Sequence, residues 1–556
     1  MRGTRIPWRR NPRAGTPPRP SSLVGEEFTR RSRSVRKKVR PPGNGLAIFP
    51  AHFLIPRVRQ TQCRGLFILA AALTCAATGA FGAAEDLTVS DQATIFAQAA
   101  GAARQLSPGS VIALVDRDGR ELLVRNADGT QGFTEAQEAI AVSKAGTAVF
   151  LSSDGEALTT RTAGFIIQQH YPPGIEFTPP GPLVGVEYSS MAYSDVNSFQ
   201  RIDGSRIPGT RLYGSPGGVP LYKDGVLVAG IGVTGPGPEV EDGSIEGPDT
   251  NEVIALTGQR GFEAPEFIQA TNIFVGGFSF PYVESAPAAI GPSVPPDTTG
   301  LQEPTAVAWP TANIGGVTGE IRSAIIGDPV PGTISGQQRL TAAEVTQIIS
   351  NAAARSLVTR AGIRQPAGVN AEVFISVVNN PNSPGTTPVV LGTFRTPDAT
   401  IFSWDVSVQK ARTALFFSDV TRAFSARTVG FLAQAMFPPG IDNEPPGPFN
   451  GLQERFSAPI ISGSGAVDGN LPNGITVFPG GFPLYRNGVL IGAIGVSGDG
   501  VDQDDLISAS GTAGFQPDPS IRADNMRYLG ARLPYAVFPR EPELKSSPSA
   551  PPVSGR

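Results

Sequence analysis

Cysteine and histidine are nearly absent from this chain, and their scarcity excludes several kinds of site. The 556 residues include two cysteines, Cys63 and Cys75, and two histidines, His52 and His170. Both cysteines and His52 lie before residue 83, close to where we expect the mature protein to begin. The mature chain therefore has no disulfide, no thiolate zinc site, no CxxCH haem attachment and no site with several histidines.

Basic residues are scarce outside the N-terminal segment. Residues 1–64 contain 16 of the 45 lysines and arginines and 2 of the 48 acidic residues, so residues 65–556 contain 29 basic and 46 acidic residues. An acidic body lacks the clustered lysines and arginines that displace counterions from nucleic acid. We therefore expect no nucleic-acid partner.

The N-terminal apolar segment is short. Residues 66–77 form an apolar run of about a dozen residues, too short to span a bilayer but typical of a signal-peptide core. Ala80 and Gly82 follow it at the spacing of a signal-peptidase site. The sequence predicts a disordered basic leader at residues 1–64 and a signal-peptide core and cleavage region at 65–82. It thus predicts a secreted or periplasmic protein with no membrane span after cleavage.

The sequence does contain a long duplication. Residues 479–498 match residues 216–235 at 13 of 20 positions, and residues 427–448 match residues 161–182 at 13 of 22. We call the two copies the first and the second repeat. A duplication of this length indicates two domains of one type.

The best-matched stretch predicts a β-hairpin in each repeat. Asp224-Gly225 in the first repeat and Asn487-Gly488 in the second join two apolar runs. These residue pairs tolerate the positive φ of a type I′ turn. The strand after each turn is apolar and rich in glycine, which indicates a buried strand against which another element packs closely.

Other patterns predict the rest of each repeat. Each begins with a helix, because Thr88 and Thr341 open capping boxes ahead of alanine-rich runs. A later helix in each repeat must stop at a proline pair, since proline lacks the amide proton. The expected strands before the hairpins lie at residues 111–115, 121–124, 372–378 and 389–394.

Two motifs together resemble a known family. The hairpin pattern Gly-Gly, Pro, Asn-Gly and Ile-Gly-Val-Ser-Gly at residues 480–498, and the KAxTA helices at 144–148 and 410–414, resemble the GlcG/HbpS family, the haem-degrading or DUF336 domain. The resemblance implies an α+β fold of two tandem domains, each an antiparallel sheet of about five strands flanked by helices. The predicted order is a domain at 85–284, a Pro- and Gly-rich linker at 285–338, a domain at 339–540 and a disordered tail at 541–556.

The same resemblance implies a function. We expect an exported haem-binding protein that serves haem uptake, storage or sensing, with haem or a similar small molecule as its partner. The two repeats are expected to form an internal pseudo-dimer, or the chain a homo-oligomer. Two alternatives stay open: a non-catalytic interaction or small-metabolite-binding module, and an enzyme of unknown reaction, for which no catalytic constellation is visible.

Candidate ligand-binding residues come from equivalent positions of the two repeats. His170 and Met436 correspond to one another, and both residue types ligate haem iron, although a residue before two prolines is often only a partly exposed contact. The full set is His170, Met436, Tyr171, Gly217, Gly218, Gly480 and Gly481.

Acidic residues after the second hairpin are weak candidates for a metal site. Asp499, Asp502, Asp504 and Asp505 lack the spacing of an EF-hand loop. The alternative is a solvated loop in which Asp504 or Asp505 caps the next helix. Lys144 and Lys410 of the two KAxTA motifs are of a residue type that can be catalytic, but a lysine on an amphipathic helix is usually a solvated or snorkelling side chain, and we interpret them as such.

Overall fold

The structure, a computed structural model, describes residues 86–186, 200–201, 204–205, 210–236, 239, 247–275, 277–292, 295–304, 307–366, 368–453 and 474–544. All of these residues belong to one compact unit, Thr78–Arg556. The predicted leader, the signal-peptide region and residues 545–556 of the predicted tail lie outside the described residues. Within the described ranges, no helix is long and apolar enough to cross a membrane.

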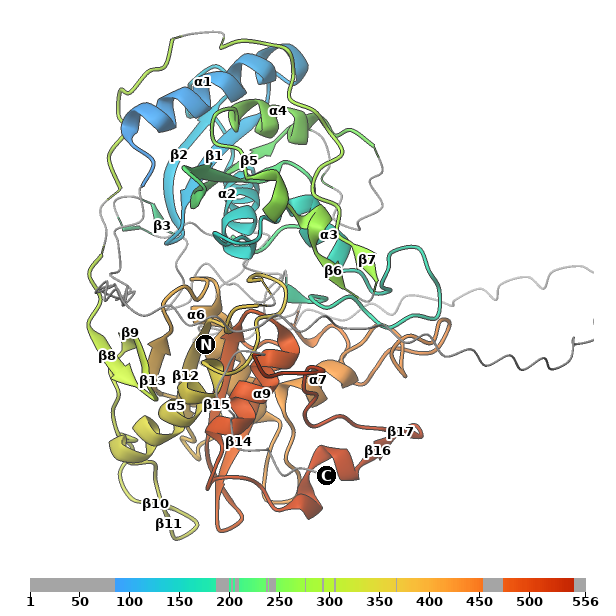
Figure 1. The fold of residues 1–556 in the computed structure, drawn as a ribbon. Helices are drawn as coiled ribbons and strands as arrows, with labels where there is room; N and C mark the ends of the chain where they lie inside the picture. Colours follow the sequence, from blue (N-terminus) through green and yellow to red (C-terminus); the bar gives the residue numbers. More distant parts are fainter. Residues whose placement is uncertain are drawn as a thin grey trace, which may run out of the picture. The chain divides into compact units, whose positions relative to one another are not determined.

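The first repeat is built around a five-stranded sheet, with blue to green elements in Figure 1. Its elements are α1 (Val89–Leu106), β1 (Val111–Asp116), β2 (Arg120–Asn126), α2 (Glu135–Leu151), α3 (Thr160–Ile166), β3 (Gln200–Arg201), β4 (Gly218–Lys223), β5 (Val226–Thr234), α4 (Thr250–Gly258), β6 (Phe274–Val275) and β7 (Phe278–Ser279), with short 3-10 turns at Glu266–Ile268 and Ala270–Asn272.

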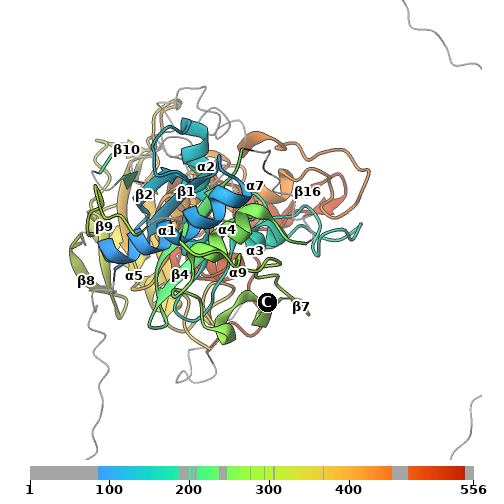
Figure 2. The ribbon, with the colours of Figure 1, turned by 90° about the horizontal axis from the view of Figure 1, so that it is seen from above.

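The strand order of this sheet is β3-β2-β1-β5-β4. Every neighbouring pair is antiparallel except β2 and β3. Helices α1 and α4 lie side by side on one face and α2 covers the other, as Figures 1 and 2 both show. Because α2 is covered by the strands and by other segments, nearly all of its side chains are buried.

The second repeat has the same plan, except that β8 (Thr311–Ile314) and β9 (Val317–Ser323) stand at the sheet edge that β3 occupies in the first repeat. Its other elements are β10 (Thr333–Ile334), β11 (Gln337–Gln338), α5 (Ala342–Ser356), β12 (Val373–Asn379), β13 (Val390–Arg395), α6 (Ser403–Phe416), α7 (Ala426–Leu432), β14 (Gly481–Arg486), β15 (Val489–Gly498), α9 (Val501–Gly511), β16 (Arg527–Tyr528) and β17 (Ala531–Arg532), with 3-10 turns at Pro519–Ile521 and Ala523–Asn525. The six-stranded sheet has the order β14-β15-β12-β13-β9-β8. The chain is therefore α+β with two similar domains in tandem, as predicted.

The predicted local signals are present in the structure. Thr88 and Thr341 cap α1 and α5, each in a complete capping box. Both residues of each hairpin turn have positive φ, 52° and 83° at Asp224 and Gly225 and 48° and 80° at Asn487 and Gly488. The hairpin's second strand lies inside each sheet, one place from the edge.

Two segments differ from the predicted linker and tail. Strands β8 and β9 lie inside the predicted linker 285–338; β9 pairs with β13 and β8 pairs with β9, so both extend the second sheet. Trp309 packs edge-on against Trp404, with ring centroids 5.4 Å apart. At the start of the predicted tail, Glu543 contacts Arg355 of α5 at 2.6 Å. Parts of both segments therefore pack on the second repeat.

Buried apolar side chains of the two repeats also pack against one another. One apolar cluster joins Phe150 and Val186 of the first repeat to Phe402, Val406 and Phe478 of the second. A cluster of this kind removes apolar surface of both repeats from water, so it stabilises their contact.

Candidate functional site

Each repeat buries one lysine beneath its glycine-rich hairpin. Lys144 of α2 is 0% exposed and Lys410 of α6 is 1% exposed. The interpretation of these lysines as solvated or snorkelling side chains is therefore wrong. Both helices are buried around most of their circumference, which leaves no solvent-facing stripe for a lysine.

One carboxylate and one or two backbone carbonyls hold each ammonium group. Nζ of Lys144 donates to the carbonyl oxygens of Pro216 at 2.8 Å and Val233 at 3.0 Å, and to Oε2 of Glu239 at 2.7 Å. Nζ of Lys410 donates to the carbonyl of Val496 at 2.9 Å and to Oδ2 of Asp504 at 2.7 Å. Buried charges need such partners, since an unpaired ion in a protein interior is costly.

The predicted glycine pairs make room for these lysines. Gly217 and Gly480 have φ of +116° and +108°, values that residues with a side chain rarely adopt. A Cβ on Gly218 would overlap the carbonyl oxygen of Lys144, and one on Gly481 would overlap that of Lys410. These four candidate residues thus bring the hairpin close to the lysine-bearing helix.

A second buried pair accompanies each lysine. Arg161 donates to both carboxylate oxygens of Glu252, at 2.8 and 2.9 Å. In the second repeat Arg427 divides its contacts between two carboxylates: its Nε contacts Oδ2 of Asp505, and a terminal nitrogen contacts Oδ1 of Asp502. Glu252 and Asp505 occupy equivalent positions of the two repeats. The alignment of the repeats therefore already indicated a paired carboxylate at this position.

The four acidic candidates for a metal site are used in ion pairs. Asp499 contacts Arg364 at 3.2 Å, Asp504 contacts Lys410, and Asp502 and Asp505 contact Arg427. Among the described residues, no group of three or more His, Cys, Asp or Glu side chains is placed to hold a metal ion. The alternative, a helix cap, is wrong, because Asp504 and Asp505 lie inside α9 and Gly500 precedes it.

His170, Tyr171 and Met436 belong to the loops that follow α3 and α7. Nδ1 of His170 lies 2.8 Å from the carbonyl oxygen of Thr178, and Nε2 lies 2.7 Å from Oδ1 of Asp442 in the second repeat. Both ring nitrogens therefore have protein partners. Met436 is half-buried in the equivalent loop.

A small cavity lies between the repeats, with a volume of about 50 Å³. Its apolar walls come from both repeats, and Lys410 and Asp504 line it. Lys144 is not among the lining residues. The walls are Phe150, Leu151, Leu158, Leu183, Val186, Ile363, Phe402, Val406, Phe478 and Val501, and the polar lining is Arg364, Thr400, Ser403, Lys410, Ser497, Asp499 and Asp504.

Burial shifts the titration of the groups at this cavity. It lowers the pKa of Lys410, although Asp504 opposes the shift. It raises the pKa of Asp504 despite the adjacent ammonium, and the pKa of Asp499 to about 7 despite Arg364. Desolvation disfavours the charged form of each group, so proton transfer within the Lys410–Asp504 pair is easier than in water.

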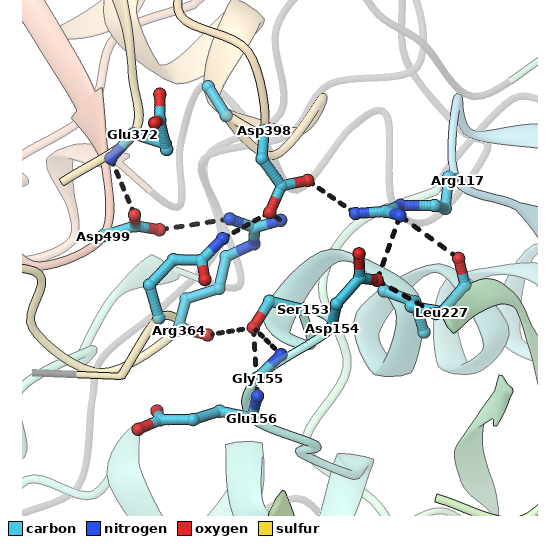
Figure 3. A network of polar contacts seen from close by, with 12 residues as sticks. Arg117, Ser153, Asp154, Gly155, Glu156, Leu227, Arg364, Glu372, Asp398 and Asp499 are labelled. Atoms are coloured by element: carbon cyan, nitrogen blue, oxygen red, sulfur yellow. Dashed lines mark hydrogen bonds and ion pairs between the residues drawn. The ribbon is translucent and has the colours of Figure 1, made fainter. Parts of the chain in front are cut away.

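A polar network crosses between the repeats beside the cavity (Figure 3). Arg117 of the first repeat contacts Asp398 of the second at 2.5 Å. Arg364 lies between Asp398 and Asp499, at 3.3 and 3.2 Å. The hydroxyl of Ser153 donates to the carbonyl of Arg364 at 2.8 Å. The network fixes the loop that carries Arg364 against the first repeat.

Glu156 at the edge of this network predicts a pH dependence. Its Oε2 is buried without a hydrogen-bond partner among the described residues. Burial, with the nearby Asp499, raises its pKa to about 8. The folded state therefore keeps a proton that the unfolded chain releases above about pH 4.3, so this group stabilises the fold below that pH and loses the effect as pH rises toward 8.

We expect Glu156→Gln to gain stability relative to the unmodified chain as pH increases from 5 to 8, because glutamine stays neutral. Urea denaturation at each pH measures the difference. Glu176→Gln, at an exposed position, is the matched control and should track the unmodified chain. A Glu156→Gln variant that becomes less stable than the unmodified chain toward pH 8 would contradict the expectation.

Comparisons with known proteins match both repeats. A family model described as haem degrading protein HbpS-like matches residues 87–245 and 349–513. The corrinoid adenosyltransferase PduO of Salmonella typhimurium is 27% identical over 146 residues, which are 26% of this chain and 33% of the relative. PduO of Citrobacter freundii is 26% identical over the same shares. The chain thus spans about a third of the length of the curated relatives it matches.

Solved structures match about a third of the chain. The PduOC:heme complex is 25% identical and covers 32% of this chain and 96% of its own, with a TM-score of 0.21. Klebsiella pneumoniae protein ORFY is 23% identical, with coverage of 33% and 96% and a TM-score of 0.21. A variant of Streptomyces reticuli HbpS is 21% identical, with coverage of 34% and 96% and a TM-score of 0.21.

Proposed function

The chain belongs to the HbpS-like family, and from this premise we propose that it binds haem. The observation that carries the proposal is the match of a haem-degrading family to both repeats. We propose further that the protein is exported and serves haem uptake, storage or sensing. The signal-peptide pattern of residues 65–82 supports export.

The cavity between the repeats is too small for haem. Its volume is about 50 Å³, whereas pockets for ligands of drug size occupy roughly 300–1,000 Å³. A macrocycle would have to separate the repeats and break the contacts of Arg117 and Ser153. A surface site therefore fits haem better than the cavity.

An apolar surface beside His170 fits a flat aromatic ligand. Tyr171 packs edge-on against Phe165 and Phe278, with ring centroids 5.6 and 6.3 Å apart. Large apolar side chains on the adjoining segments are exposed to solvent. They are Ile175 (47%), Phe177 (58%), Phe274 (68%) and Phe278 (44%). Exposed apolar side chains gathered on one surface often mark a binding site.

His170 would supply the iron ligand. Its Nδ1 contact with the carbonyl of Thr178 is the kind of second bond that orients a ligating histidine. Its Nε2, the atom that would face iron, now contacts Asp442, so binding requires that contact to open. Haem, when bound, supplies an iron centre whose axial ligand tunes its redox and ligand chemistry.

Titration of the full chain with haem tests the proposal. We expect a saturable Soret shift that weakens by at least about tenfold in His170→Ala, since loss of even an outer-shell partner of a metal costs 10–100-fold in affinity. Asp442→Ala should bind haem as tightly as the unmodified chain or more tightly, because it frees Nε2.

Met436→Ala is the matched control in the second repeat and should bind as the unmodified chain does. Unchanged binding by His170→Ala would overturn the assignment of the ligand. Absence of any saturable Soret shift with the unmodified chain would overturn haem binding itself.

A further inference from the structure

The two buried lysines are not equivalent. An ammonium group has three N–H donors. Lys144 has three acceptors, Pro216, Val233 and Glu239. Lys410 has two acceptors in the described part of the chain, Val496 and Asp504. The ring of Phe478 also lies near Nζ, with its centroid 5.9 Å away. Lys410 therefore has donor capacity to spare.

Lys410 is also the lysine that reaches the cavity between the repeats. Lys410, Asp504 and Phe478 all line it. The volume of about 50 Å³ compares with roughly 10–15 Å³ for a single water molecule. The cavity therefore accommodates a molecule of a few non-hydrogen atoms, with apolar walls around it and the lysine as its polar group.

The charges around the cavity favour a neutral molecule. Lys410 is already paired with Asp504, and Arg364 with Asp499 and Asp398. An anionic ligand would meet carboxylates at every cation, and like charges at close range in an apolar cavity repel strongly. A small neutral molecule with one polar atom meets no such barrier.

We propose that Lys410 captures a small neutral aldehyde in this cavity as an imine. A lysine desolvated in an apolar pocket is a suitable nucleophile for a carbonyl group. The proposal does not depend on haem binding, because it concerns a different repeat and a ligand without a metal.

The reaction balances with groups that line the cavity. Oδ2 of Asp504, 2.7 Å from Nζ, takes a proton from the ammonium. The free amine attacks the carbonyl carbon, the carbonyl π pair moves to oxygen, and that oxygen takes a proton from the attacking nitrogen. Asp504 returns its proton to the resulting hydroxyl, water leaves, and the nitrogen lone pair forms the C=N bond of a protonated imine paired with the Asp504 carboxylate. No oxidant or reductant takes part. Burial favours the neutral forms of both residues.

The scarcity of lysine makes the proposal easy to test. Between residues 86 and 544 the chain has three lysines, Lys144, Lys223 and Lys410. Lys223 lies at the surface with 30% of its side chain exposed, and Lys144 is as buried as Lys410 but does not line the cavity. The protein therefore carries its own surface control and its own buried control.

Borohydride trapping with acetaldehyde is the experiment. The full folded chain is incubated with acetaldehyde, reduced with sodium borohydride and mapped by mass spectrometry of its peptides. We expect an ethyl group on Lys410 at least about tenfold faster than on Lys144, because a desolvated amine beside a cavity reacts while an enclosed one does not. Benzaldehyde, which exceeds the cavity, should label Lys223 but not Lys410.

Val406→Leu provides a mild variant that fills part of the cavity and keeps the core apolar. It should slow labelling of Lys410 and leave labelling of Lys223 unchanged. If Lys410 is labelled no faster than Lys144, the proposal is overturned. Equal rates at the two buried lysines would mean that aldehyde reaches both of them only when the fold opens. Equal labelling of Lys410 by acetaldehyde and benzaldehyde would overturn it as well.

Discussion

Replacing Asp504 by alanine is expected to lower the free energy of unfolding by about 3–5 kcal/mol, because it leaves the Lys410 ammonium buried without its counterion. Lys410 is 1% exposed and Asp504 is 3% exposed, so little water reaches either group. Urea denaturation followed by tryptophan fluorescence or circular dichroism measures the change.

Asp502→Ala is the matched control on the same helix. The Asp502 side chain is 37% exposed and contacts Arg427, so its loss should cost about 0–1 kcal/mol. The double variant Lys410→Met with Asp504→Leu should be more stable than Asp504→Ala alone, since apolar residues often replace a buried ion pair at little cost. An Asp504→Ala variant as stable as Asp502→Ala would show that Lys410 does not need its counterion.

Replacing Gly481 by alanine is expected to lower the free energy of unfolding by about 1–3 kcal/mol or more, the usual cost of overfilling a core. The added Cβ would overlap the carbonyl oxygen of Lys410, so α6 and β14 would have to move apart. Because Gly481 does not have positive φ, the loss of stability would come from steric overlap and not from backbone strain. The same denaturation assay measures it.

Gly368→Ala is the control, since Gly368 is exposed and a Cβ there has no atom within 4 Å. It should change stability by less than about 0.5 kcal/mol. If Gly481→Ala were equally harmless, the close approach of the hairpin to the lysine-bearing helix would not be needed for the fold.

The sequence predicted the elements that local chemistry determines. The turn residues Asp224-Gly225 and Asn487-Gly488 specify the hairpins, and the threonine caps specify the first helix of each repeat. Turn and capping motifs depend only on residues close together in the sequence, so they could be recognised without knowledge of the tertiary contacts. The duplication then extended each prediction to the second copy.

The lysine sites were missed because a lysine on a helix is normally solvated. One signal was available in the sequence: residues 86–544 contain three lysines, and two of them occupy equivalent positions in the two repeats. What the sequence could not show is that α2 and α6 are covered on nearly all sides. That coverage comes from segments distant along the chain and from the contact between the repeats.

The extra strands of the second sheet could have been predicted from a turn motif, but the composition around that motif is typical of a linker. Gly315-Gly316, with φ of +63° and +86°, joins β8 to β9 as a two-residue hairpin turn. The many prolines and glycines around it suggested a linker instead. Contacts between the repeats, such as His170 with Asp442, had no signal in a single sequence because they join residues with no shared motif.

The two repeats therefore differ where chemistry is concerned: the first has His170 where the second has Met436, and the second has the lysine that lines the cavity. The stoichiometry of haem binding tests this difference most directly. Titration of the full chain should saturate at one haem per chain, with that one site weakened in His170→Ala. Saturation at two haems per chain, or one haem bound equally well without His170, would contradict it.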